Sequence, residues 1–140
     1  MRERLMIHGF RLFGHPSHPM MNHVPIGTWL VSVPFGVLGL WLGSPLWWAV
    51  SFWIIVAGLA AAVPTVLSGM VDYAVNVRGS RPERLAIIHM TLMLIVAGVF
   101  VLSLVCRHVP EPLESASRWL AACCDCIGTL LLVVGGWVGG

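Results

Sequence analysis

Residues 24–71 read VPIGTWLVSVPFGVLGLWLGSPLWWAVSFWIIVAGLAAAVPTVLSGMV, a run without a single formally charged side chain. Gly43, Ser44 and Pro45 interrupt the run once and divide it into two apolar segments, residues 24–42 and 46–71. Each segment is near the roughly 20 residues that an α-helix needs to cross a bilayer. A connection this short makes consecutive helices antiparallel. The stretch therefore predicts a membrane-spanning helical hairpin.

Two further apolar segments, residues 85–106 and 119–138, extend this pattern to four spans. Hydrophobic residues make up 58% of the chain and charged residues 10%, a composition outside the range of soluble globular proteins. The net charge of +2 is too small and too scattered for a nucleic-acid surface, so nucleic acid is excluded as a partner. We predict an all-α fold, an integral membrane antiparallel four-helix bundle over residues 15–140.

The first fourteen residues form a separate amphipathic segment. On a helical wheel Leu5, Met6 and Phe10 lie on one side, and Arg4 and Arg11 lie on the other. This pattern predicts a short helix in the membrane interface. A frayed tail whose arginines only set the orientation is the alternative.

Arginine distribution predicts the orientation in the membrane. The N-terminal segment and residues 72–84 each hold three arginines, whereas residues 107–118 on the opposite side hold two. The positive-inside rule then places both termini in the cytoplasm of a bacterial inner membrane, with membrane lipid as the surrounding partner.

Histidines and prolines cluster immediately before the first span. His15 and His18 each precede a proline, and His23 follows five residues after His18. Proline fixes its own φ angle and restricts the residue before it to extended conformations. We therefore expect a braced entry loop that covers the bundle end and presents these three histidines.

His89 lies one turn inside the third span, and Asp72 ends the second, so topology brings both to the same membrane side as the entry loop. An ionisable side chain within a membrane helix is costly and usually faces a partner or a cavity. His89 is accordingly the most informative single residue. The alternative is a neutral imidazole that hydrogen-bonds a neighbouring helix.

Two imidazoles facing each other across a helix bundle can hold a b-type haem. We assign His23 and His89 as its metal ligands, between the first and third helices, with His15, His18 and Asp72 as supporting contacts of the cofactor. A tetrapyrrole pigment held by one histidine stays open as an alternative. Zinc is a weaker candidate, because prolines interrupt the histidine spacing.

The corresponding function is that of a small redox-associated membrane subunit. The sequence contains no nucleophile with a base at a recognisable spacing, no phosphate loop and no paired carboxylates, so it gives little support to stand-alone hydrolytic catalysis. Whether the protein is an enzyme of another kind stays open. A different class of function is also open: a cofactor-free accessory subunit that packs within a larger membrane-protein complex. The many glycines and other small residues of the spans favour close helix contacts of this kind.

Four cysteines, Cys106, Cys123, Cys124 and Cys126, lie toward the far ends of the third and fourth spans. A disulfide to Cys106, a metal site and plain apolar packing are all open for them. Asp125 stands among these cysteines, and a carboxylate within a span is a functional candidate. The alternative, which we favour, is that it is hydrated near the outer surface or paired with an arginine such as Arg107.

The chain resembles an uncharacterised family of small bacterial four-helix membrane proteins. The resemblance rests on the His-Pro-x-His-Pro element at residues 15–19, on the sequence SGMVDY at residues 68–73, on His89, and on GGWVG at residues 135–139. Some members of that family are associated with redox modules such as Rieske-type iron-sulfur domains. The resemblance therefore implies a redox context, which agrees with the haem hypothesis.

Overall fold

A computed structural model describes residues 11–12, 15–108 and 114–139. Within these residues four long helices, each apolar enough to cross a membrane, confirm the predicted all-α bundle. They are α1 (Ser17–Trp41), α2 (Pro45–Asp72), α3 (Glu83–Cys106) and α4 (Glu114–Gly139). A single turn of π-helix, η1 (Tyr73–Val77), continues α2 before the chain turns toward α3.

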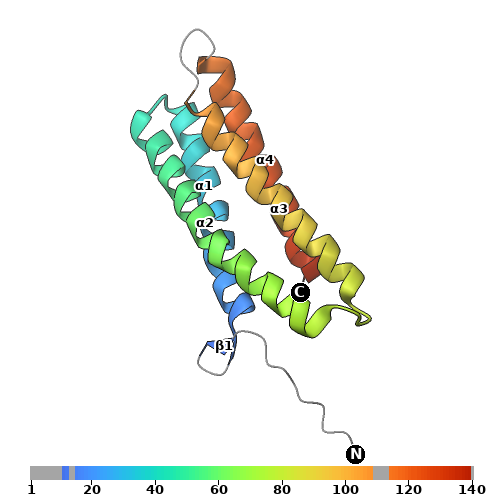
Figure 1. The fold of residues 1–140 in the computed structure, drawn as a ribbon. Coiled ribbons are helices and arrows are strands. Elements are labelled where there is room, and N and C mark those ends of the chain that lie inside the picture. Colours follow the sequence, from blue (N-terminus) through green and yellow to red (C-terminus); the bar gives the residue numbers. More distant parts are fainter. Residues whose placement is uncertain (1–10, 13–14, 109–113, 140) are drawn as a thin grey trace, which may run out of the picture.

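The helices alternate in direction, so the start of α1 and the end of α4 lie at the bundle end that also holds the α2–α3 connection (Figure 1). The other end holds the tight turn between α1 and α2, where Gly43 has a φ of 59° in the region that favours glycine. α1 packs along α2, α3 packs along α4, and α1 also touches α4, whereas α2 and α3 share few contacts. This weak α2–α3 seam is where the bundle is hollow.

The core between the two helical hairpins is built on aromatic stacking. The rings of Trp29 in α1 and Phe100 in α3 stack with their centroids 4.9 Å apart, and Ile55 and Val96 beside them are fully buried. Gly128 of α4 lies against the edge of the Phe100 ring, where a Cβ would come within 3.0 Å. Most other apolar side chains face outward, as expected for a bundle whose solvent is lipid.

The first helix starts earlier than predicted, at Ser17 rather than at residue 24. His18 and His23 therefore lie within α1, and the expected entry loop is wrong for these two residues. Pro19 is compatible with this start, because the first turn of a helix has no backbone partner for its N–H groups.

Residues before α1 are described only in part. His15–Pro16 forms strand β2, which pairs antiparallel with β1 at Arg11–Leu12, so the chain is extended there rather than helical. The remainder of the predicted interfacial helix lies outside the described residues.

Pro25 lies inside α1 and shows how the bundle tolerates a missing backbone donor. Without an N–H at Pro25, the carbonyl of Met21 loses its helical partner. The hydroxyl of Thr65 in α2 donates to that Met21 oxygen at 3.3 Å, in addition to its bond to the Ala61 oxygen. A threonine of the neighbouring helix thus compensates for the proline, as membrane helices require.

Candidate functional site: a histidine cavity

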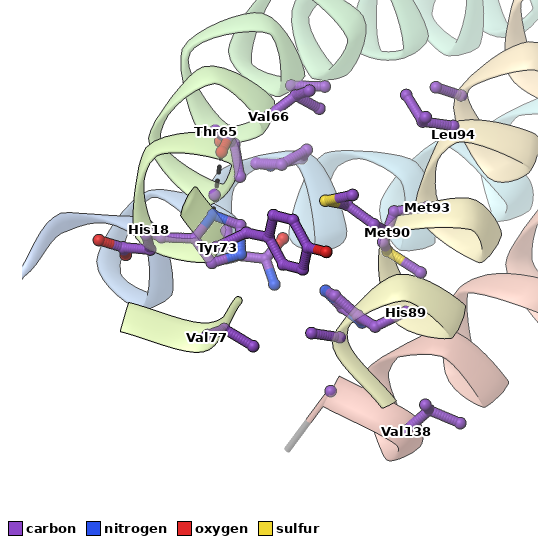
Figure 2. A pocket seen from close by; sticks show the side chains of 18 of the residues that line it. His18, Thr65, Val66, Tyr73, Val77, His89, Met90, Met93, Leu94 and Val138 are labelled. Atoms are coloured by element: carbon purple, nitrogen blue, oxygen red, sulfur yellow. Dashed lines mark hydrogen bonds between the residues drawn. The ribbon is translucent and has the colours of Figure 1, made fainter. Parts of the chain in front are cut away.

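A cavity of about 450 Å³ opens at the weak α2–α3 seam, near the bundle end that holds the α2–α3 connection. α1, α2, η1, α3 and the last turn of α4 all contribute to its walls. Figure 2 shows His18 and His89 entering this space from different helices, with Tyr73 between them in that view. We call it the histidine cavity.

One face of α1 lines the cavity. His18, Asn22, Pro25 and Trp29 all contribute, at intervals of four, three and four residues, which is the spacing of one helical face. His23 stands five residues after His18, about 140° around the helix at roughly 100° per residue. It is exposed and does not line the cavity.

His18 is held firmly against α2. Its Nδ1 lies 2.9 Å from the carbonyl oxygen of Thr65, and the Ser68 hydroxyl is 3.4 Å from the same nitrogen. The imidazole packs on Gly69, where a Cβ would come within 2.7 Å of the ring. Any residue larger than glycine at position 69 would displace this histidine.

His89 is held in the same manner against α4. Its Nδ1 lies 2.8 Å from the carbonyl oxygen of Gly135. Its imidazole packs on Gly139, where a Cβ would collide with the ring. The two histidines thus have the same two contacts: Nδ1 bonds a backbone carbonyl, and the ring packs on a glycine.

The bond to the carbonyl fixes the tautomer that each imidazole has when it is neutral. A carbonyl oxygen can only accept a hydrogen bond, so Nδ1 carries the proton and donates it, while Nε2 of the neutral ring keeps its lone pair. In the described part of the chain no hydrogen-bond partner occupies either Nε2. The ring centroids are 6.4 Å apart and the ring planes are nearly perpendicular, at 83°.

The remaining walls are largely apolar, with a few polar side chains. The apolar residues are Ala62, Val66, Leu85, Ala86, Met90, Met93, Leu94, Ala97 and Val138. Asp72 and Asn22, both half-buried, add polar groups, and neither side chain has a hydrogen-bond partner among the described residues. Of the predicted site residues, the structure thus brings together His18, His89 and Asp72. His15 lies in strand β2.

The donor set restricts which metals could be held. A structural zinc site needs four protein ligands, and a catalytic one needs three. No group of three or more histidine, cysteine, aspartate or glutamate side chains suited to a metal ion occurs in the part of the chain that the structure describes. A haem iron differs, because its macrocycle supplies four nitrogens and the protein adds only axial ligands.

A second polar constellation lies at the opposite end of the bundle. Arg107, at the end of α3, bonds the Asp125 carboxylate of α4 through a nitrogen–oxygen contact of 2.5 Å, and both side chains are almost completely buried. Ser103 donates to the other Asp125 oxygen at 2.5 Å. This result confirms the predicted pairing of Asp125 with Arg107.

The same guanidinium reaches α2. It donates to the Ser51 hydroxyl at 3.1 Å and to the Trp48 carbonyl at 3.4 Å, and it lies over the Trp48 ring at 4.0 Å from the centroid. Ser51 in turn donates to the Ser32 carbonyl of α1 at 2.9 Å. Burial lowers the pKa of Arg107, while Asp125 opposes that shift. An arginine stays protonated under such a shift.

We call Ser51, Ser103, Arg107 and Asp125, together with Trp48, the arginine cluster. It ties all four helices together, and Gly36 of α1 allows the close approach, since a Cβ there would lie 3.1 Å from the Ser51 hydroxyl. Every charged group of the cluster has a protein partner.

The four cysteines are free in the structure. Cys106 and Cys124 are buried next to the arginine cluster, whereas Cys123 and Cys126 are exposed on the outer face of α4. No disulfide joins them in the structure, and no group of three or more metal-ligating side chains among the described residues includes them.

Comparison with known proteins gives a family and no more. A family model described as "Predicted membrane protein (DUF2231)" matches residues 14–140. No curated protein and no solved structure matches the chain.

Proposed function

The chain belongs to the DUF2231 family of predicted membrane proteins, and from the geometry of the histidine cavity we propose that it is a small membrane redox protein that binds a b-type haem there. His18 of α1 and His89 of α3 are the proposed axial ligands. His18 thus takes the place of His23 in the hypothesis drawn from the sequence.

One observation carries the proposal: two histidines with the same hydrogen bond from Nδ1 to a backbone carbonyl line the same cavity. Each has its Nδ1 proton committed to a backbone carbonyl, which leaves the Nε2 lone pair for a metal. A metal ion bound between two imidazole nitrogens at about 2.0 Å from each holds the ring centroids roughly 6 Å apart. The observed separation is 6.4 Å.

The surroundings also suit a flat apolar macrocycle. Ligand cavities that enclose small molecules commonly have volumes of about 300–1,000 Å³ and mostly apolar walls. The histidine cavity, at about 450 Å³, has such walls in Met90, Met93, Leu94 and their neighbours. Asn22 supplies an amide donor for the carboxylate edge of the ligand.

The ligand set favours electron transfer over chemistry at the metal. If both axial positions are taken by histidines, no position is open for a substrate. The protein then contributes binding, orientation and a shell that excludes water, and the two Nδ1–H donors make the imidazoles better ligands. We infer that electrons are passed to and from larger membrane redox partners in a bacterial inner membrane.

The spectrum of the purified protein tests this proposal. Protein expressed with ample haem should show a Soret band with one haem per chain, and His89→Ala should abolish its six-coordinate form. His108→Ala is the matched control, because His108 is exposed at the opposite end of the bundle. Absence of a Soret band in the wild-type protein, before and after addition of haemin, would leave the accessory-subunit function as the surviving candidate.

A further inference from the structure

The histidine cavity is closed at one end by the segment that joins α2 to α3. Tyr73 and Val77 of η1, and Pro82 after it, all line the cavity. The π-helical turn is wider than an α-helical turn, and such turns often occur at functional sites.

A single carboxylate fastens this segment. The Tyr73 hydroxyl donates to Oε1 of Glu83 at 2.8 Å, and the backbone N–H of Gly79 donates to Oε2 at 2.9 Å. Gly79 has a φ of 75°, which favours glycine, so the tight turn brings its N–H to the carboxylate. We call Tyr73, Gly79 and Glu83 the latch.

Little else holds α2 to α3 at this end of the bundle. The two helices share few contacts along the seam, and their other hydrogen bonds in the described residues run through Arg107 at the far end. Loss of the latch would therefore free the connecting segment without breaking the core.

The charged side chains around the latch indicate which kind of ligand would enter the cavity here. Arg78, Arg81 and Arg84 are exposed on this segment and at the start of α3. These arginines are next in sequence to Val77, Pro82 and Leu85, which line the cavity, and exposed guanidinium groups attract anionic ligands. A flat apolar molecule with a carboxylate edge combines this attraction with the apolar walls behind it.

We propose that the latch controls the exchange of such an amphiphilic anion between the histidine cavity and the water at this end of the bundle. Tyr73 and Glu83 act as positioning residues that hold the connecting segment across part of the cavity mouth. The inference rests on the proposed function only for the identity of the ligand, haem. That the latch controls access to the cavity is a separate claim, which does not depend on which ligand binds.

Cysteine labelling tests the latch. Ala86 lines the cavity and is half-buried, so Ala86→Cys in a chain without its native cysteines reports access by a charged, water-soluble maleimide. Tyr73→Phe should raise the labelling rate a few-fold, because the segment loses one of the two hydrogen bonds that fasten it to Glu83. Glu83→Gln should do the same. Equal rates with and without these changes would overturn the latch.

Two further measurements separate the latch from the haem proposal. Ala116→Cys, exposed at the opposite end, should be labelled at the same rate in every variant. Haemin should protect Ala86→Cys in the latched protein. Faster labelling of the variants without haemin protection would support the latch and contradict the haem; haemin protection with unchanged variant rates would do the reverse.

Discussion

The two ends of the bundle treat buried polar groups in opposite ways. In the arginine cluster the charged groups of Arg107 and Asp125 are bonded to protein partners. In the histidine cavity each imidazole is bonded through one nitrogen only, and the other nitrogen borders a cavity of about 450 Å³. Polar groups in a membrane interior are costly. The satisfied end therefore holds the helices together, whereas the end with the unbonded nitrogens is the one at which we propose a ligand.

The largest effect should come from breaking the arginine cluster. Asp125→Ala leaves a buried guanidinium without its carboxylate, which should cost about 3–5 kcal/mol of stability. The double change Arg107→Leu with Asp125→Leu should recover most of this loss, because both charges are removed together. Unfolding in mixed micelles, followed by circular dichroism, measures both values. A double variant as unstable as the single one would contradict this explanation, because the loss of stability would then not come from the unpaired charge of Arg107.

A smaller effect, confined to the ligand, should follow from crowding one imidazole. In Gly139→Ala the new methyl group would strike the His89 ring. Overpacking of this kind costs about 1–3 kcal/mol, so haem affinity should fall about 10- to 100-fold. Gly136→Ala is the control, since nothing lies within 4 Å of a Cβ there. Haem titration distinguishes them; equal affinities would mean that Gly139 does not position His89.

The smallest effect should come from the proline-compensating threonine, Thr65, which lines the histidine cavity. Thr65→Val keeps the shape of the side chain but removes its hydrogen bond to the Met21 carbonyl. Interhelical hydrogen bonds of this type average about 0.6 kcal/mol in membranes. Thr91→Val, at an exposed position, should change the unfolding free energy even less. A loss of several kcal/mol at Thr65 would show that Pro25 depends on this bond far more than proposed.

The sequence could predict the fold because bilayer thickness requires long apolar spans, and four of them were plain in the chain. It could also predict the Asp125–Arg107 pair, since an aspartate within a span needs a counter-charge. His89 was identified for the same reason. These inferences depend only on the lengths of the apolar segments and on the chemistry of single side chains, both of which can be read directly from a sequence.

The partner of His89 could not be predicted in the same way. The prolines at 16 and 19 indicated a loop, yet α1 begins at Ser17, and seven additional helical residues rotate His18 inward and His23 outward. The four-three-four spacing of His18, Asn22, Pro25 and Trp29 was the signal that would have found this face. The contact of each ring with a glycine depends on how the helices are rotated against one another, and this rotation cannot be read from a single sequence.

The most direct test of the account compares two histidines five residues apart. The absorption spectra of His18→Ala and His23→Ala, each purified with ample haem, should differ sharply. We predict that His18→Ala loses the six-coordinate low-spin spectrum, whereas His23→Ala retains the spectrum of the wild-type protein. Loss of that spectrum in His23→Ala with retention in His18→Ala would contradict the account and restore His23 as the ligand.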